Sequence, residues 1–284
     1  MKVQELNLYK LEIIDKYLID KLSIKKLSEQ YSCSQSTIRK FLLMNGVTEE
    51  QIKTHAKYDL KPNLFNKIST EEDAYWLGLL YADGHIATKG YEISLDLKAE
   101  DKYLVEQFRQ YCGCGKELRK HIIKRNDKEY ISYVCNFSSK ETKNNLVKLG
   151  CVPAKSLILT CPTEEQVPQK LFPHFVRGYC DGDGYLRWEQ IRHKEVIIAG
   201  TEKFLTGIAE RMNWNNVYIK QDPRGQVFTL TIWRMNEVYQ AMKQMYEDAH
   251  VYMIRKHAIF LKAQEYMNSL SLAENKPLEL TGNS

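Results

Sequence analysis

The sequence predicts an α+β fold made of two pseudo-symmetric halves, each with the element order αββαββα, preceded by a small all-α helix-turn-helix domain. Two observations predict it. A nine-residue segment ending at Gly84 has a counterpart ending at Gly184, and similar elements follow both copies. The first 46 residues instead carry apolar side chains at helical spacing. We expect a helix-turn-helix domain over residues 1–46, a basic linker over 47–68, a first repeat over 69–160, a second over 161–267 and a polar tail over 268–284.

Composition and charge indicate a globular protein with a sizeable core. The 284 residues are 43% hydrophobic and 27% charged, which excludes a wholly disordered chain. No apolar run approaches the ~18 residues that cross a membrane, and the N-terminus lacks a targeting pattern, so we expect a cytoplasmic protein without a membrane partner. The seven cysteines lack paired metal-ligand spacing and predict reduced thiols. The net charge of +5 is compatible with nucleic acid, and residues 1–68 hold 12 basic against 8 acidic side chains.

The first segment predicts three short helices. In the first helix the apolar residues three to four apart are Leu8, Leu11, Ile14, Leu18 and Leu22. Residues 24–31 and 34–42 predict two further helices around a short turn. Ser34 is a suitable N-cap, because its hydroxyl can accept from free amides of the first turn, and Gly46 is suited to end the last helix. The side chains that we expect to face inward are Leu27, Tyr31, Ile38, Phe41 and Leu42.

This segment resembles the helix-turn-helix of site-specific recombinases and small repressors, in which the helix after the turn enters the major groove of DNA. The resemblance implies that polar side chains of the last helix face DNA, namely Gln35, Ser36, Thr37, Arg39 and Lys40. A three-helix protein-interaction module has the same apolar pattern and stays an alternative. Residues 47–68 lose the periodicity, which predicts a linker that follows a DNA backbone or serves as a passive tether.

The duplicated segments predict two closely packed helices. Each copy has two small residues four positions apart, on one helical face: Gly78 and Ala82, then Gly178 and Gly182. Faces without large side chains let two helix backbones approach closely. If the helices pair about a pseudo-twofold axis, Asp83 and Asp183 meet at their C-terminal ends. Two carboxylates there repel each other unless a cation lies between them, and carboxylate oxygens suit Mg²⁺.

The residues after each copy predict matching elements. The first copy is followed by a strand, a helix, two strands and a helix over residues 91–97, 101–112, 116–124, 130–137 and 140–149. The second is followed by the same sequence of elements over residues 195–199, 201–212, 216–221, 227–233 and 236–247. A duplication of this length predicts two copies of one fold.

Both segments, Trp76 to Gly84 and Val176 to Gly184, resemble the LAGLIDADG motif of homing endonucleases, in the monomeric two-repeat form with an N-terminal helix-turn-helix. The resemblance implies a monomer with internal pseudo-twofold symmetry that binds a long, specific double-stranded DNA target. It implies hydrolysis of one phosphodiester per strand, with Mg²⁺ or Mn²⁺ held by Asp83 and Asp183. The chain departs from the motif at Tyr81, where the family has an aspartate, and at Arg177, where it has a small residue.

In this family, each repeat carries a basic residue just after its last helix. Lys155 lies 72 residues after Asp83, and Lys256 lies 73 residues after Asp183, so the two lysines occupy equivalent positions. The resemblance implies that they offset the charge that develops at the phosphate or position the attacking water. The four residues together are the expected catalytic set.

The resemblance also implies that the strands of each half form a saddle on the major groove, with every second side chain facing DNA. The expected contacts are Lys98, Arg119, Lys124, Arg125, Arg187, Trp188, Arg192, Lys220, Arg224 and Arg234. Two other functions are compatible with this fold: an RNA maturase that assists intron splicing, and a non-catalytic DNA-binding regulator. The retained aspartates and lysines argue against the regulator.

Overall fold

The computed structural model describes residues 3–20, 22–55, 60–125, 128–189, 193–223 and 225–274. The chain divides into two compact units. One comprises residues 1–62 with 110–116, and the other comprises residues 63–109 with 117–284.

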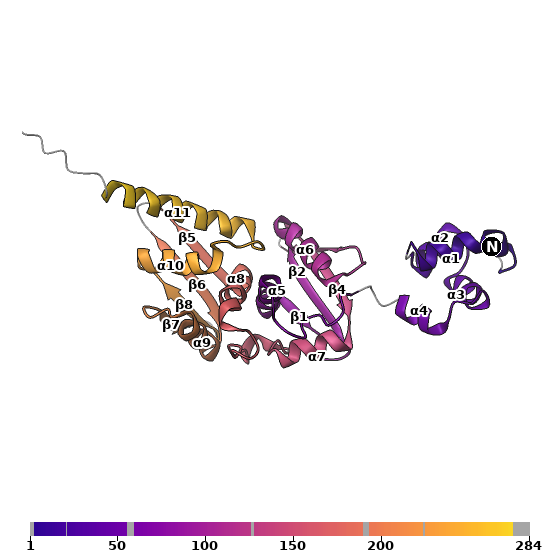
Figure 1. The fold of residues 1–284 in the computed structure, drawn as a ribbon, viewed down its shortest axis with the longest axis horizontal. Helices are drawn as coiled ribbons and strands as arrows, with labels where there is room; N and C mark the ends of the chain where they lie inside the picture. Colours follow the sequence, from indigo (N-terminus) through magenta and orange to yellow (C-terminus); the bar gives the residue numbers. More distant parts are fainter. Residues whose placement is uncertain are drawn as a thin grey trace, which may run out of the picture. The chain divides into compact units, whose positions relative to one another are not determined.

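The N-terminal unit is helical (Figure 1). A 3₁₀ helix, η1, precedes its α-helices, and these elements are η1 Glu5–Tyr9, α1 Lys10–Leu18, α2 Ile24–Gln30, α3 Gln35–Met44 and α4 Glu49–His55. The predicted N-cap of α3 is confirmed, because the Ser34 hydroxyl accepts from the Thr37 amide at 3.1 Å. Gly46 follows α3 at φ +90°, which confirms the predicted end of that helix.

The core of this unit differs from the predicted one in its first helix and at its end. Leu8 and Leu11 are 85% and 74% exposed, and the buried side chains there include Leu6, Ile13 and Tyr17. The predicted first helix is divided, because residues 5–9 form a 3₁₀ helix with three residues per turn, so an α-helical period cannot be carried across them. The predicted linker begins too early, since the core also contains Val47 and Ile52. The five inward-facing residues predicted for α2, α3 and the turn are buried as expected: Leu27, Tyr31, Ile38, Phe41 and Leu42.

The second unit contains two four-stranded antiparallel sheets with the same strand order, which confirms the predicted α+β fold and its duplication. The first sheet, in the order β1-β2-β4-β3, consists of β1 Gly84–Ile86, β2 Glu92–Lys98, β3 Arg119–Arg125 and β4 Lys128–Ser138. The second, in the order β5-β6-β8-β7, consists of β5 Gly184–Trp188, β6 Lys194–Gly200, β7 Tyr218–Gln221 and β8 Phe228–Ile232. The short strands β1 and β5 begin at the final glycine of each duplicated segment.

Helices complete both halves in the predicted order αββαββα. Those of the first half are α5 Glu71–Ala82, α6 Lys102–Cys112 and α7 Lys140–Lys148. Those of the second half are α8 Phe172–Asp183, α9 Glu202–Met212 and α10 Met235–Tyr246. A further helix, α11 Ile254–Glu274, runs into the predicted polar tail, whose first seven residues are therefore helical. Among the described residues, no helix combines the length and apolarity needed to cross a membrane.

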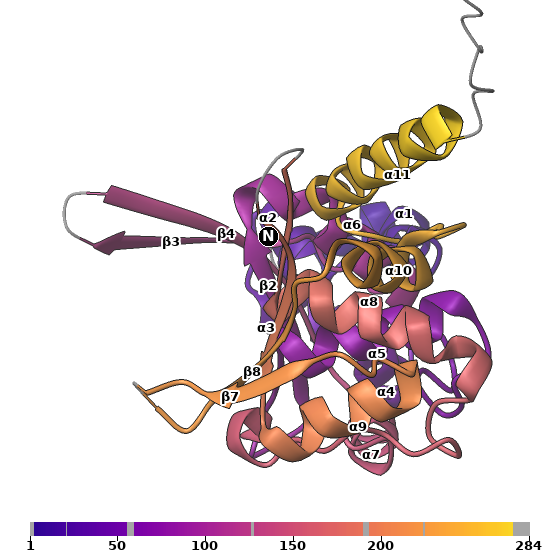
Figure 2. The same cartoon turned by 90° about the vertical axis from the view of Figure 1, so that its left-hand side faces the viewer.

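Each sheet buries one face and leaves the other open. In the first sheet the buried side chains of β2 are Ile93, Leu95 and Leu97, which alternate with more exposed residues. In the second, Val196 and Ile198 of β6 are buried in the same way. Figure 1 shows α5 and α8 side by side between the two sheets. In Figure 2 the β3–β4 hairpin extends well beyond the helices of this unit, and β7 and β8 form a shorter projection.

Candidate active site

The helices α5 and α8 pack backbone against backbone through two glycines. A Cβ atom added to Gly78 would lie 2.0 Å from the carbonyl oxygen of Phe175, and one added to Gly178 would lie 2.0 Å from that of Tyr75. Neither position tolerates a side chain without moving a backbone. The two contacts are reciprocal, as a pseudo-twofold axis between the helices requires. The close helix pair that the glycine spacing predicts is therefore present.

The same helix pair brings Asp83 and Asp183 together. Asp83 is the C-cap of α5, and Asp183 is the last residue of α8. One residue before Asp183, an added Cβ on Gly182 would lie 2.8 Å from Oδ2 of Asp83. Each aspartate retains solvent-exposed surface although its carboxyl group is closely surrounded by protein atoms. Two partly desolvated carboxylates that remain accessible are suited to bind a ligand from solution.

Both aspartates have raised pKa values. The pKa of Asp83 is raised to about 6, first because the surrounding protein removes water from its carboxylate and then because Asp183 lies close by. Loss of hydration also raises the pKa of Asp183. The ammonium groups of Lys155 and Lys256 oppose the rise at both sites. The two lysines do not fully offset the rise, so an additional positive charge next to the carboxylates would stabilise their ionised forms.

Lys155 and Lys256 occupy equivalent buried positions behind the two aspartates. The Lys155 ammonium donates to the carbonyl oxygen of Gly84. The Lys256 ammonium donates to the carbonyl oxygen of Gly184 at 2.7 Å, to that of Asp181 at 2.8 Å and to that of Cys180. Each lysine therefore binds the turn that follows one motif aspartate, at the negative end of a helix dipole. The structure brings all four expected catalytic residues into one site.

The sixth position of each motif copy anchors the segment that leads to a lysine. The Tyr81 hydroxyl donates to the carbonyl oxygen of Leu149, six residues before Lys155. In the second half Asp181 is fully buried, and its Oδ2 accepts from the amide of Met253, three residues before Lys256, at 2.7 Å. The Asp181 carboxylate also accepts from two tyrosine hydroxyls, Tyr75 at 2.8 Å and Tyr246 at 2.7 Å. The departure at Tyr81 thus preserves the mechanical role of this position.

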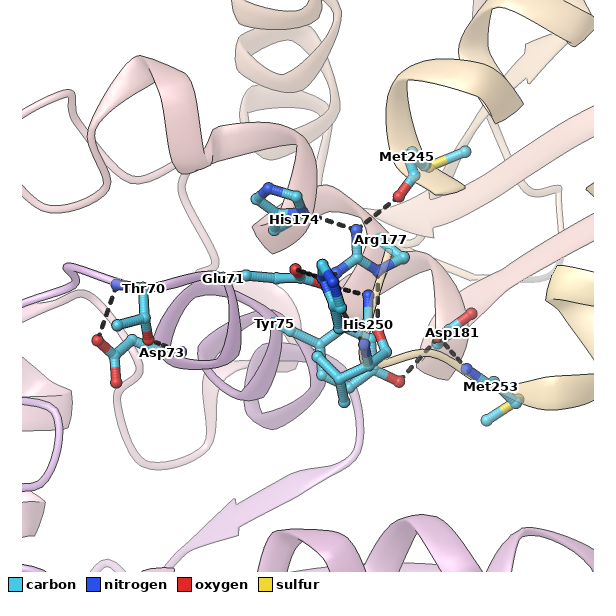
Figure 3. Close-up of polar contacts among 11 residues, drawn as sticks. Thr70, Glu71, Asp73, Tyr75, His174, Arg177, Asp181, Met245, His250 and Met253 are labelled. Carbon is cyan, nitrogen blue, oxygen red and sulfur yellow. Dashed lines mark hydrogen bonds and ion pairs between the residues drawn. The ribbon is translucent and has the colours of Figure 1, made fainter. Parts of the chain in front are cut away.

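Arg177 connects the two halves from a fully buried position (Figure 3). Its guanidinium donates to Oε1 of Glu71 on α5 at 2.6 Å and to the carbonyl oxygens of Met245 at 2.6 Å and Val251 at 3.0 Å. Glu71 in turn accepts from the backbone amide of His250 at 2.8 Å and from its ring at 2.9 Å. Sequence reasoning missed this cluster. The available signal was a charged residue within an otherwise buried helix face, because a buried guanidinium requires acceptors.

Four of the strand residues expected to contact DNA lie on the open faces of the sheets. Strand register and alternation place Lys98 and Arg119 on the open face of the first sheet, and Arg187 and Lys220 on that of the second. Arg187 is engaged by Glu189, at 2.9 Å from Nε and 2.7 Å from Nη2. These positions are compatible with the predicted contacts.

Two other strand residues contradict the prediction. Trp188 is buried, and its ring packs against Tyr239 and Tyr266 on the helix-covered face of the second sheet. Lys124 is exposed but lies on the opposite face of β3 from Arg119, with its ammonium 3.1 Å from Glu129, so the two cannot contact DNA through the same face of the sheet. Both errors have the same cause, because a shift of one residue along a strand moves a side chain to the other face.

The other predicted DNA contacts lie at the start of α10, outside the described residues, or on α3. Arg234 is exposed at the N-cap of α10, 3.5 Å from Glu237. Arg125 is the last residue of β3, but its side chain lies outside the described part of the structure, as do Arg192 and Arg224 entirely. On α3 the exposed polar residues are Gln35, Ser36, Arg39 and Lys40, whereas Thr37 is half-buried. Arg39 forms an ion pair with Glu49 of α4.

Comparison with solved structures agrees with this architecture. The homing endonuclease I-WcaI bound to its DNA recognition sequence superposes with a TM-score of 0.53 at 11% identity, over 76% of this chain and 96% of that one. The LAGLIDADG meganuclease I-AabMI bound to uncleaved DNA gives 0.40 at 11% identity, over 70% and 90%. Full-length DUF199/WhiA from Thermatoga maritima gives 0.43 at 16% identity, over 78% and 80%. No protein-family model and no curated protein matches the chain. The chain has the fold of LAGLIDADG homing endonucleases, which confirms the resemblance indicated by the duplicated motif.

Proposed function

We propose that this chain is a sequence-specific endonuclease that cuts double-stranded DNA by hydrolysing one phosphodiester in each strand. The observation that carries the proposal is the pair of accessible carboxylates, Asp83 and Asp183, at the adjoining ends of two glycine-packed helices. Each carboxylate is backed by a buried lysine of its own repeat. Two equivalent half-sites on one axis suit a substrate with two antiparallel strands.

The donor set fits a divalent cation such as Mg²⁺ or Mn²⁺. Asp83 and Asp183 would hold it, because loss of hydration raises the pKa of both carboxyl groups and a cation between them would stabilise both ionised forms. Among the described residues, no group of three or more His, Cys, Asp or Glu side chains is placed to hold a metal. Mg²⁺ suits such a two-carboxylate site, because it keeps several waters and binds substrate phosphates. When bound, such a cation lowers the pKa of a ligated water and stabilises a departing oxygen.

The chain's own residues orient the substrate and hold the site. Lys155 and Lys256 fix the two Asp-Gly turns through the carbonyl oxygens of Gly84 and Gly184. Their charges also make the site favourable for a phosphate group, whose negative charge grows during hydrolysis. In this proposal the open faces of the two sheets enter the major groove, and α3 makes a separate DNA contact.

The test uses the full chain and its native insertion locus on a supercoiled plasmid, with Mg²⁺ or with a chelator. We expect linear product only with the metal. Asp83→Asn and Asp183→Asn should abolish cutting but leave the gel shift of the same DNA intact. Asp248→Asn is the matched control, because this exposed aspartate lies after α10 and should cut like the wild type.

Three outcomes contradict the proposal in different ways. Wild-type cutting by either motif variant would show that the carboxylates do not form the site. Salt-dependent DNA binding without metal-dependent cutting would indicate a DNA-binding regulator. Stimulation of intron splicing, without DNA cutting, would indicate a maturase.

A further inference from the structure

The open face of the second sheet carries an uncharged row of side chains across all four strands. The ladder register aligns Tyr185 of β5 with Ile197 of β6, Ile197 with Thr231 of β8, and Thr231 with Tyr218 of β7. Tyr185 and Tyr218 are 50% and 54% exposed, and the two central residues are half-buried. On β5, β6 and β8 the buried neighbours are Leu186, Val196, Ile198, Leu230 and Ile232. The four side chains of the row therefore share the open face, since the register places Tyr218 opposite Thr231.

Among the described strand residues of this face, the charged groups lie at the margins of the row. The next row on one side aligns Ala199, Thr229 and Lys220, with the lysine on the outermost strand. The next row on the other side pairs Arg187 with Glu195. Lys220 places a positive charge at one margin, whereas Arg187 at the other margin is paired with Glu189 and Glu195. The centre of the row therefore suits an apolar group of a ligand that also carries an anionic group on the Lys220 side. The row also begins two residues after Asp183, so it is continuous with the candidate active site.

The equivalent row of the first sheet has different chemistry. Gly84 and Gly184 begin equivalent strands, so His85 corresponds to Tyr185. The register aligns His85 with Ser94 and Ser94 with Asn136, and all three side chains can form hydrogen bonds. The two halves therefore share a backbone but present different groups at the same place.

We propose, building on the DNA-binding part of the proposed function, that the second sheet contacts thymine 5-methyl groups in the half of the target that it covers. The thymine methyl is the apolar group that the major groove displays, whereas purine edges offer hydrogen-bonding groups. The tyrosine rings, the Ile197 side chain and the Thr231 methyl group can all make apolar contacts with the thymine methyl. The first sheet, with His85, Ser94 and Asn136, reads its half-site by hydrogen bonds. The two halves of the target thus differ in thymine content.

The test replaces thymine by deoxyuridine, which lacks only the 5-methyl group and keeps the same base pairing. The full chain first selects duplexes from a randomised pool in the presence of a chelator. The selected duplex is then made with deoxyuridine in one half or the other, and binding is measured by fluorescence anisotropy. We expect about fourfold weaker binding for each contacted methyl, from about 0.8 kcal/mol per buried carbon group. The effect should be confined to one half.

Three variants assign the effect to the second sheet. Ile197→Ala and the conservative Thr231→Ser should weaken binding to the thymine duplex and lose sensitivity to deoxyuridine. Ser94→Ala, the matched variant on the first sheet, should keep the full sensitivity. Thermal unfolding checks that each variant is folded. If Ile197→Ala does not fold, Thr231→Ser still tests the contact, because it removes one methyl group and keeps the hydroxyl.

Several results overturn the inference. Specific DNA binding that is insensitive to deoxyuridine in both halves refutes it and leaves the proposed nuclease standing. Methyl sensitivity that persists in Ile197→Ala and Thr231→Ser assigns the contact elsewhere. A dimer of the free protein that Tyr218→Ala dissociates assigns the row to a second copy of this chain. Failure to select any DNA refutes the inference and the proposed function together.

Discussion

Gly178→Ala tests whether the contact between α5 and α8 builds the site. The added Cβ would lie 2.0 Å from the carbonyl oxygen of Tyr75 and 2.9 Å from the amide nitrogen of Leu79. Both are backbone atoms of a neighbouring helix, so no side-chain rotation relieves the overlap. An ordinary contact needs at least 3.4 Å, so the helices must separate by roughly 1 Å or shift along each other. Overpacking of a tight core costs about 1–3 kcal/mol, and a clash with two rigid backbones belongs at the upper end.

We therefore expect Gly178→Ala to lower the free energy of unfolding by about 3 kcal/mol. For a unit of this size, that corresponds to a decrease in melting temperature of roughly 6–12 °C. The displacement should also reach the carboxylates, because Gly182, one turn further on, lies against Asp83. Divalent-cation affinity should then fall at temperatures where the variant remains folded.

Thermal and urea unfolding followed by circular dichroism measure the first effect, and calorimetric titration with Mn²⁺ measures the second. Gly115→Ala is the matched control, because an added Cβ there meets no atom within 4 Å. Its change should remain within about 0.5 kcal/mol. If Gly178→Ala melts at the wild-type temperature, the two helices are not packed through this glycine and the pseudo-twofold site is wrong.

Four further predictions concern the contacts around this helix pair. Arg177→Met leaves the Glu71 carboxylate without its guanidinium, so urea unfolding should show a loss of about 3–5 kcal/mol; a loss under 1 kcal/mol would contradict this. Tyr81→Phe removes one hydroxyl donor and should cost about 1 kcal/mol in the same assay, whereas an unchanged stability would exclude that hydrogen bond. Asp83→Asn should raise the melting temperature of the metal-free protein at pH 7, because a pKa raised to about 6 means that folding disfavours the ionised carboxylate; the gain should shrink as the pH falls below 6 and vanish at about pH 3, where the acid is neutral in both states, and a gain that persists there has another cause. Mn²⁺ affinity should fall as the pH decreases through about 6, since protonation of Asp83 competes with the metal, and a constant affinity between pH 5 and 7 would exclude Asp83 as a ligand.

The two equivalent half-sites were predictable because the same motif, with its glycine and its aspartate, occurs twice in the sequence. The helices can approach each other only where Gly78 and Gly178 carry no side chain, and the sequence shows glycine at both positions. The 72- and 73-residue separations from aspartate to lysine also follow from one repeated topology. Local pattern and internal repetition together therefore fix the element order and the four-residue site.

Side-chain direction on the strands was less predictable. Trp188 and Arg187 are adjacent in β5, so one faces the core and the other faces outward, and composition alone does not say which. An aromatic residue among arginines fits a DNA contact as readily as a core position. The buried cluster around Arg177 was beyond local reasoning for another reason: its acceptor Glu71 lies 106 residues away, and Met245 and Val251 are also distant in sequence.

The two halves differ most where the motif meets the rest of each repeat. At the sixth motif position, the Tyr81 hydroxyl donates to a carbonyl oxygen, whereas the Asp181 carboxylate accepts from an amide, yet both hold the segment ahead of a lysine. A donor in one half and an acceptor in the other can both hold this segment, because what the site requires is the position of the lysine that follows. At the helix contact there is no such freedom, since backbone meets backbone. Pseudo-symmetry in this fold is therefore strict at the glycine contact and relaxed at the sixth motif position, where two different side chains hold the same segment.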